Sequence, residues 1–533
     1  MSRVKRTGWR ILVLAALLLI NGFPLPAHAQ LQEDCGVVDA IDYPIDGFSI
    51  EHDDFGLYRG IFNGYHAGID LAFGRLGAPI RAAARGRVTF SDPEGWDTEK
   101  GVVVIEHIFP DGSTYFSLYG HMEERGGHTF PRVGACVDRG EIIGAVGRPR
   151  QSAPHLHYEI RRMRASTGGP GYWSADPLQA GWTHPIEFTE RWRLRFNPAF
   201  RHMITATAAP SAPPLWQPDG SAVFISRTMI EQQTFQDETA WQLSVRNLAG
   251  VVNLPGGRIL GRTLGNQMIV FEGGRFVASW QSDLPLRTAP LRLSEHIVFL
   301  TEDNRVVAYD ADGSLRWQTG PLGTYVERHM VSGDLLAVAG EQDGAYLLWV
   351  INAAGEVVYA AAAPAPVIPL QAPTGGFLIL VASQISLLDT TLQLRPLIDA
   401  GRALSRASQA TYDQAGNIYV YPGYGTYLYA FGPDGALRWE TRLPSPPMQA
   451  PLLGVGSGCL VYTLMPDGAL LAYRAVDGAL RGMAPLYAGG ERQNANARYL
   501  SVLPGDQVRF SAGYLTVATV DGPALANMSD CGA

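Results

Sequence analysis

A short unit that repeats along the second half of the chain limits the possible folds more than any other feature. Residues 307–317 (VAYDADGSLRW) are echoed at 429–439 and 471–481, and more weakly at 350–358. Each copy consists of two strand-like runs around a turn of the Asp-Gly type, which is the pattern of a β-hairpin. Repeated hairpins of this kind predict an all-β fold for this half of the chain.

A second recurring feature gives the length of the repeating unit. An Ala-Pro pair precedes a strand-like run at Pro213, Pro290 and Pro451, and the gaps between these prolines are 77 and 161 residues. These gaps are close to two and four units of forty residues. A period near forty with several short strands per unit is typical of β-propeller blades. Residues 212–533 hold eight such units, and two degenerate units leave seven blades as the alternative.

The repeats resemble those of the pyrroloquinoline-quinone-type propeller family, whose blades carry a similar Tyr-Ala-x-Asp-x-x-x-Gly-x-x-x-Trp signature. The quinoprotein enzymes also carry two adjacent cysteines over their cofactor, and no two cysteines are adjacent in this chain. We therefore interpret residues 201–533 as a cofactor-free propeller used for binding or assembly. Tyr421, Tyr424 and Tyr427 surround a Pro-Gly turn. They are either packing between blades or an exposed platform for a glycan or protein ligand.

The first 29 residues have the pattern of a secretory signal peptide. Basic residues precede an apolar run at 11–20, and Ala27-His28-Ala29 fits a cleavage site. The apolar run is too short to span a bilayer comfortably, and no later stretch has the pattern of a membrane helix. We expect an exported bacterial protein, secreted or in the cell envelope, without a membrane span.

The charge of the chain argues against nucleic-acid partners. The formal net charge is -8, and Lys5 and Lys100 are the only lysines. A general nucleic-acid binder would carry a basic face. The composition likewise gives no reason to expect electrostatic capture by an anionic membrane.

Residues 30–200 form the other expected domain, and its pattern is mainly antiparallel β-structure. A β-branched run at 101–107 and an alternating stretch at 113–121 predict strands, while helical periodicity is hard to find. Nine of the eleven histidines that follow the signal peptide lie at or before His202. A histidine metal site is therefore expected in this domain. Surface or capping roles are expected for His52, His107, His128, His184 and His202.

Two short motifs in this domain contain metal-ligating residues at suggestive spacings. In an extended strand, residues an even number apart point to the same side, which pairs His155 with His157 and His66 with Asp70. Zinc accepts imidazole and carboxylate ligands, and a catalytic site keeps three protein ligands and one open position. His66, Asp70 and His157 would form such a set, with His155 free beside the metal.

The order of these motifs resembles the signature of the lysostaphin/LytM-type zinc endopeptidases. The signature residues here are His66-x-x-x-Asp70, Tyr119-Gly120-His121-Met122 and His155-Leu156-His157-Tyr158-Glu159. The similarity covers residues 43–160. It implies that His66, Asp70 and His157 bind one zinc ion and that His155 is the general base. It also implies that His121 stabilises the developing oxyanion or shares the proton transfer.

Three features near these motifs leave alternatives open. Glu159 lies on the same side of its strand as His157 and either orients that ligand or has a plain structural role. The loops at 91–100 and 147–153 differ from the usual turns of the family. Both are expected to rim the substrate groove, so the peptide preference is not predicted.

Four cysteines remain after the signal peptide, which in an exported chain indicates disulfides. Four cysteines allow three pairings. Pairing within each half of the chain is the simplest, and it predicts Cys35–Cys136 in the first domain and Cys459–Cys531 in the propeller.

The sequence thus predicts an exported zinc endopeptidase that hydrolyses peptide bonds, with peptidoglycan cross-bridges as the leading substrate and the propeller as a binding or targeting module. One alternative is a catalytically silent scaffold or regulator with the peptidase fold. Such degenerate domains lose metal ligands, and here none is lost. The other alternative is a secreted protease that acts on proteins.

Overall fold

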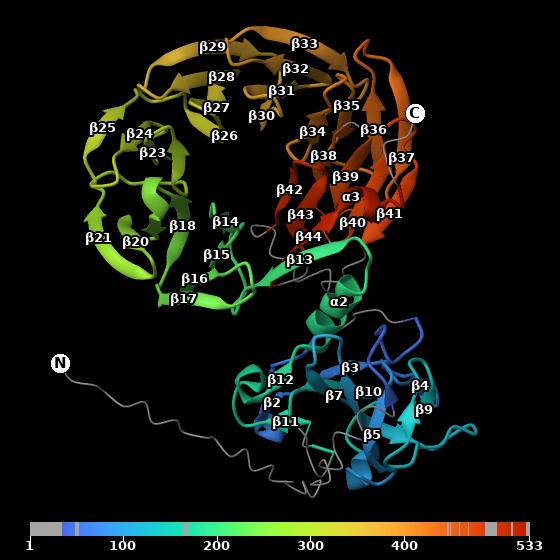
Figure 1. Ribbon diagram of the computed structural model, residues 1–533. Coiled ribbons are helices and arrows are strands. Elements are labelled where there is room, and N and C mark those ends of the chain that lie inside the picture. Colours follow the sequence, from blue (N-terminus) through green and yellow to red (C-terminus); the bar gives the residue numbers. More distant parts are fainter. Residues whose placement is uncertain are drawn as a thin grey trace, which may run out of the picture.

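The computed structural model describes residues 35–47, 53–163, 168–169, 171–444, 447, 449–457, 459–466, 468–484, 498–512 and 515–528. The predicted signal peptide, His52 and Cys531 lie outside these residues. Figure 1 shows a small β-domain next to a large ring of β-sheets. The all-β prediction is confirmed. No helix within the described ranges is long and apolar enough to cross a membrane.

A nine-stranded antiparallel sheet forms the centre of the N-terminal domain. Its strands are β3 (Ile69–Leu71), β4 (Pro79–Arg81), β5 (Gly86–Asp92), β6 (Gly101–Ile108), β7 (Thr114–Glu123), β8 (Cys136–Val137), β9 (Ile142–Val146), β10 (Leu156–Arg161) and β12 (Trp182–Thr183). The main path runs β12-β10-β7-β6-β5-β8, while β3 pairs with β10 and β9 pairs with both β7 and β4. Strand β10 is buried along its whole length, because it has partners on both edges.

A second, three-stranded sheet has the order β1-β2-β11. Its strands are β1 (Tyr58–Arg59), β2 (Gly64–His66) and β11 (Tyr172–Trp173), and three 3-10 helices lie between the strands of this domain: η1 (Gly60–Phe62), η2 (Asp97–Glu99) and η3 (Pro177–Ala180). A disulfide joins Cys35 to Cys136 across 101 residues, which confirms the first predicted pairing. Cys459 is also disulfide-bonded, and its pairing with Cys531 stays a prediction.

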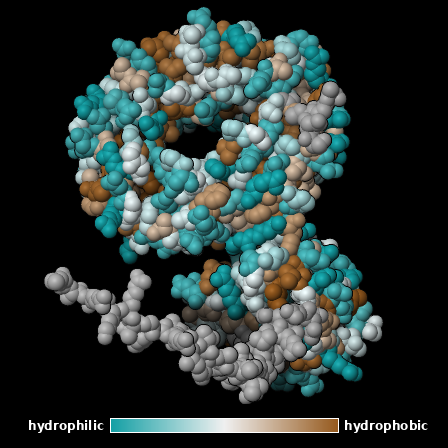
Figure 2. All heavy atoms as spheres, viewed as in Figure 1, coloured by the Kyte–Doolittle hydropathy of each residue, from teal (hydrophilic) through white to brown (hydrophobic). Residues whose placement is uncertain are grey.

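The ring consists of eight four-stranded antiparallel sheets among the described residues, so the prediction of eight blades is confirmed and the alternative of seven is not. Figure 2 shows that the ring is open at its centre. The strands of the first four consecutive blades are β14 (Leu215–Trp216), β15 (Ala222–Ile225), β16 (Met229–Gln233), β17 (Thr239–Ser244); β18 (Leu248–Asn253), β19 (Ile259–Thr263), β20 (Gln267–Glu272), β21 (Arg275–Gln281); β22 (Leu291–Leu293), β23 (His296–Leu300), β24 (Val306–Tyr309), β25 (Leu315–Gln318); and β26 (Tyr325–Ser332), β27 (Leu335–Gln342), β28 (Ala345–Asn352), β29 (Val357–Ala363).

The next three blades have the same arrangement, and the eighth combines strands from both ends of the propeller. Their strands are β30 (Val367–Gln371), β31 (Phe377–Val381), β32 (Gln384–Leu388), β33 (Leu394–Asp399); β34 (Gln409–Tyr412), β35 (Ile418–Tyr421), β36 (Tyr427–Phe431), β37 (Leu437–Arg442); β38 (Leu452–Val455), β39 (Leu460–Leu464), β40 (Leu470–Arg474), β41 (Leu480–Ala484); and β13 (Phe200–Thr205), β44 (Thr516–Asp521), β43 (Gln507–Ser511), β42 (Leu500–Leu503). The short helices η4 (Pro255–Gly257) and α3 (Gly522–Leu525) lie outside the sheets.

The repeated tryptophan and glycine of the sequence signature explain how neighbouring blades hold together. Each signature hairpin is the outer pair of strands of one blade, and its tryptophan packs against the turn glycine of the next. A Cβ atom on Gly355 would lie 2.4 Å from the Trp317 ring, and one on Gly478 would lie 2.6 Å from the Trp439 ring. The indole of Trp317 also donates a hydrogen bond of 2.9 Å to the Ala353 carbonyl. Only glycine leaves room for these contacts.

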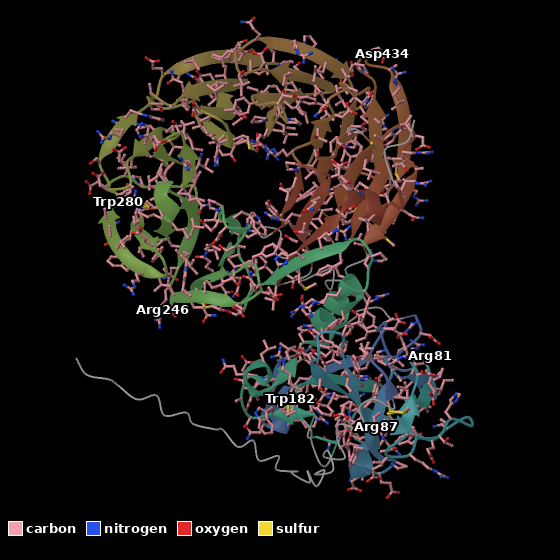
Figure 3. All side chains as sticks on the ribbon, in the orientation of Figure 1. Arg81, Arg87, Trp182, Arg246, Trp280 and Asp434 are labelled. Carbon is pink, nitrogen blue, oxygen red and sulfur yellow. A yellow bond between two sulfur atoms is a disulfide. The ribbon has the colours of Figure 1, made fainter. Side chains whose placement is uncertain are left out.

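The same contact recurs at the outer rim of the second blade. Trp280 lies on this rim (Figure 3), and a Cβ atom on Gly313 of the following blade would lie 2.7 Å from its ring. Because the contact joins residues that are 33 apart in the chain, it fixes the stacking of one repeat on the next.

The ring closes through a strand that comes from the start of the propeller. Strand β13 pairs with β44, so the outermost strand of the eighth blade precedes the other three by almost three hundred residues. This pairing leaves no open seam between first and last blade, and exposed sheet edges are otherwise sites of aggregation. The sequence repeats predicted the ring but not this exchange, since β13 lacks the hairpin signature.

Helix α2 (Pro185–Arg195) joins the two domains. Ile186, Phe188 and Trp192 pack into the core of the N-terminal domain. Leu194 instead belongs to the apolar cluster of the propeller, together with residues of the last two blades. The helix was not predicted from the sequence. Its side chains are buried against two different domains, so its apolar residues do not follow the usual amphipathic period.

We expect Leu194→Ala to lower the free energy of unfolding by about 2–5 kcal/mol, because it leaves a cavity in a well-packed core. Leu194 is 3% exposed. Denaturant titration followed by intrinsic fluorescence measures the loss. The matched control is Leu178→Ala, whose side chain is 49% exposed and whose effect should stay within about 0.5 kcal/mol. Equal effects of the two substitutions would contradict the packing of α2 on the propeller.

Candidate metal centre

The pairing of β10 brings the predicted site residues together. His157 lies opposite Asp70 of β3 on one edge and opposite Gly120 of β7 on the other. His66 ends β2, and His121 follows Gly120. His155 comes directly before β10. All five predicted residues therefore meet at one end of the large sheet, next to the small sheet.

Three ligand atoms converge at the centre of this group. His66 Nε2 lies 2.9 Å from His157 Nδ1 and 3.2 Å from Asp70 Oδ1, and His157 Nδ1 lies 3.3 Å from Asp70 Oδ1. A tetrahedral ion with bonds of about 2.0–2.1 Å holds its ligand atoms about 3.3 Å apart. The donor set and its spacing thus fit a zinc ion bound by one carboxylate and two imidazoles.

A glycine makes this convergence possible. Gly68 lies between His66 and Asp70 in the chain, and a Cβ atom there would lie 2.4 Å from the Tyr158 carbonyl oxygen and 2.9 Å from His157 Nε2. A larger residue would push β10 away from the His66–Asp70 segment. The glycine in the motif therefore serves the packing of the site, while His66 and Asp70, two residues away on either side, supply ligand atoms.

Asp54 and Arg59 support the side of the centre that carries His66. Asp54 Oδ1 lies 3.1 Å from His66 Nδ1 and accepts a hydrogen bond of 3.2 Å from the Asp70 amide. Arg59 pairs with Asp54 and lies 3.4 Å from Asp70 Oδ2. The two carboxylates are thereby held in place by the same guanidinium. Neither residue was predicted from the sequence, because neither lies within one of the motifs.

Glu159 supports the side of the centre that carries His157. Its Oε1 lies 2.9 Å from His157 Nε2, and its Oε2 accepts a hydrogen bond of 2.8 Å from the Trp182 indole. Arg161, on the same face of β10, lies 3.4 Å from Oε2. Glu159 and Arg161 are both fully buried. Glu159 thus orients His157 and leaves Nδ1 to face the centre, which favours the first of the two roles considered for it.

The charges around the centre suit a bound cation. Burial lowers the pKa of His66, but its hydrogen bonds to Asp54 and Asp70 outweigh burial and raise this pKa to about 9. Burial raises the pKa of Asp70, yet hydrogen bonds with His157 and His66 hold it well below its usual range. The same negative charges that favour protons on these imidazoles would favour a metal cation, whose binding displaces protons.

His155 and His121 lie beside the ligand atoms with one ring nitrogen each facing the cleft. Nδ1 of His155 donates a hydrogen bond of 2.8 Å to the Ala153 carbonyl, and Nδ1 of His121 donates one of 2.7 Å to the Glu99 carbonyl. In both rings Nε2 is then left as a proton acceptor. His155 Nε2 lies 3.6 Å from Asp70 Oδ1. The ring centroids of His155 and His121 are 4.5 Å apart.

Burial keeps these two histidines neutral. It lowers the pKa of His121, with a smaller contribution from His155 and His157, to about 3. It also lowers the pKa of His155. A neutral imidazole with a free Nε2 is the form that can accept a proton.

A cavity of about 420 Å³ opens in front of the centre. It is lined by Arg59, Ile61, Phe62, Asp70, Phe73, Trp96, Glu99, His121, Gln151, Ser152, His155, His157, Gly171 and Tyr172. Trp96 and Glu99 come from the loop at 91–100, and Gln151 and Ser152 come from the loop at 147–153. Both loops therefore rim the cleft. Trp96 and Tyr172 were not predicted from the sequence, because their approach to the histidines depends on loop paths that carry no periodic signal.

The other histidines that the structure describes, up to and including His202 of β13, lie away from the centre. His107 is buried between the Arg85 carbonyl and the Ser117 hydroxyl. His184 contacts Asp53, and His202 stacks on Phe235. His128 is half-buried in a turn.

The fold and the site together define a peptidase domain joined to a β-propeller. Residues 64–168 match the model of peptidase family M23. Residues 229–378 match the model described as outer membrane protein assembly factor BamB. Both resemblances predicted from the sequence are thus confirmed. No curated protein sequence matches the chain.

Solved structures similar to this chain cover about 60% of it. BamB from Moraxella catarrhalis is 14% identical, with 60% of this chain and 97% of that chain covered and a TM-score of 0.45. The computationally designed Ika8 protein is 11% identical, with coverage of 61% and 99% and a TM-score of 0.43. Sqt1 from Saccharomyces cerevisiae is 13% identical, with coverage of 61% and 97% and a TM-score of 0.41.

We expect Glu159→Gln to weaken zinc binding about 10- to 100-fold, because the amide removes the negative charge that orients and polarises His157. Competition with a chelating dye measures the dissociation constant. The matched control is Glu106→Gln on β6, which β7 separates from β10; this variant should bind zinc as the unchanged protein does. Unaltered affinity in Glu159→Gln would assign Glu159 a purely structural role.

Proposed function

We propose that this protein is an exported, zinc-dependent endopeptidase. The observation that carries the proposal is the convergence of His66, Asp70 and His157 on one point, with His155 and His121 beside it. When bound there, zinc supplies Lewis acidity, which makes water more acidic and polarises a carbonyl group. The three ligand residues would hold one ion and leave one position open.

In this proposal the other two histidines carry the proton transfers. His155 Nε2 accepts the proton of the attacking water and later delivers it to the leaving amine. The Ala153 carbonyl supports this role, since it fixes the proton of the neutral ring on Nδ1. His121 makes the same kind of hydrogen bond with the Glu99 carbonyl, and it either shares the proton transfer or stabilises the developing oxyanion.

Peptidoglycan cross-bridges are the substrate that the sequence resemblance implies, and BamB-like repeats support a place in the cell envelope. A polypeptide substrate is the second candidate. It is favoured by the apolar side chains of Ile61 and Phe62, which line the cavity and are 83% and 40% exposed.

The propeller in this proposal is a binding module that holds the peptidase near its substrate, which raises the local concentration. Of the three tyrosines singled out in the sequence, Tyr421 is buried at 2% exposure and belongs to the packing between blades. Tyr424 and Tyr427 are 51% and 39% exposed. These two can form a platform for a glycan or a protein.

We expect His157→Ala and Asp70→Ala to abolish both zinc binding and hydrolysis, because each removes one of three ligands. His155→Ala should keep zinc and lose about 100- to 10,000-fold in kcat, since it removes a positioned acid/base. Zinc content is measured by atomic absorption. Hydrolysis is measured on purified sacculi and on a labelled unfolded protein. Undiminished hydrolysis after chelation would rule out the proposed function.

We expect the double variant Tyr424→Ala/Tyr427→Ala to bind the preferred polymeric substrate more weakly, by about 1–3 kcal/mol if both rings stack on the ligand. Its hydrolysis of a short soluble peptide should not change. Co-sedimentation with sacculi measures binding, and Phe276→Ala, at another exposed aromatic side chain of the ring, is the control. Unchanged sedimentation would place the binding surface elsewhere on the propeller.

A further inference from the structure

We propose that the cleft in front of the candidate metal centre selects a polypeptide with a bulky apolar side chain next to the scissile bond. This inference rests on the proposed function and specifies the substrate of the same site.

One wall of the cleft is apolar and lies open to solvent. Ile61 and Phe62 of η1 are 83% and 40% exposed. The Phe62 ring stacks on Tyr172 of β11, with centroids 4.2 Å apart and planes 19° apart. Tyr172 in turn packs against His66 at 5.1 Å. The wall therefore runs without a break from solvent to a candidate metal ligand.

The opposite side of the histidine cluster is also covered by aromatic rings. Phe73 is 38% exposed and stacks on His155, with centroids 5.2 Å apart. Trp96 packs edge-on against His121 at 5.0 Å and against His157 at 5.4 Å. A substrate that places its scissile bond between the histidines would thus lay the flanking side chains against aromatic surfaces.

Two observations fix the orientation of these rings in the free protein. The Trp96 indole donates a hydrogen bond of 2.7 Å to the Gly169 carbonyl. Tyr172 accepts a hydrogen bond of 3.2 Å from Arg59. The walls are therefore formed before substrate binds, so little side-chain freedom is lost on binding.

The cation of the cleft does not compete with this apolar character. Arg59 is the one cation among the lining residues, and its guanidinium contacts Asp54 and Asp70. It is therefore not available as a carboxylate clamp without loosening the metal centre.

Exposed apolar side chains gathered around a functional site are typical of ligand contacts. A cross-bridge made of glycine or other small residues would leave the walls formed by Ile61, Phe62 and Phe73 uncovered, whereas a polypeptide with an apolar side chain would cover them.

The test uses the mature full-length protein, loaded with zinc, and quenched fluorogenic peptides of equal length. One peptide has glycine on both sides of the central bond, and the others place leucine or phenylalanine on one side or the other. We expect kcat/KM to be about 10- to 100-fold higher for at least one apolar peptide, because burial of a large apolar side chain is worth that factor. In the metal-free chain, fluorescence anisotropy should give a dissociation constant at least about tenfold lower for the same peptide.

Two variants connect the preference to the wall. Phe62→Ala should reduce the ratio of kcat/KM between the apolar and the glycine peptide by about fivefold or more. Ile61→Ser should also reduce this ratio. Because the Ile61 side chain is exposed, this substitution should leave the fold intact. Val133→Ser, at a 60% exposed position that does not line the cavity, should leave the ratio unchanged.

The possible failures are distinct. Equal or better cleavage of the glycine peptide would overturn the substrate inference while leaving the zinc peptidase in place. An apolar preference that both wall variants retain would overturn it too, since other residues would then select the side chain. Failure of the zinc-loaded protein to cleave any peptide, with equal affinities for all of them, would overturn this inference and the proposed function together.

Discussion

The register of β10 between β3 and β7 is the constraint on which the candidate site depends. It sets His157 opposite Asp70 on one side and next to the segment that carries His121 on the other. Side chains alternate along a strand, so a slip of one residue would turn His157 away and bring Leu156 into the centre. The apolar side chains of Leu156, Tyr158 and Ile160 hold the register, since all three are buried in the core on the opposite face.

Burial of so many charged groups at one point has to be compensated, because an unpaired buried charge is strongly destabilising. Each ligand residue of the centre has its own partner: His66 contacts Asp54, Asp70 contacts Arg59, and His157 contacts Glu159. The partners also set which ring nitrogen faces the centre. The same contacts thus serve stability and chemistry, and a substitution of Asp54, Arg59 or Glu159 would alter both.

The two domains are joined more closely than a linker would join them. Helix α2 contributes Trp192 to one core and Leu194 to the other, and the next segment becomes the closing strand β13 of the ring. The chain therefore passes directly from the peptidase domain through α2 into the outermost strand of the eighth blade. A binding surface on the propeller would act at a set distance from the cleft, which suits a large or polymeric substrate better than a small soluble one.

Local spacing and the family resemblance together predicted the five histidine and aspartate residues that the structure brings together, and the repeat length predicted the eight-bladed ring, because strand alternation and blade period are short-range patterns. The tryptophan and glycine of the repeated signature, such as Trp317 and Gly355, are the residues that make the contact between neighbouring blades. Only the tertiary structure decided that Asp54, Arg59 and Tyr172 support the centre, that Tyr421 is buried while Tyr424 is exposed, and that β13 closes the ring. These outcomes depend on contacts between segments far apart in the chain, whose approach is set by packing and loop paths that leave no periodic trace in the sequence.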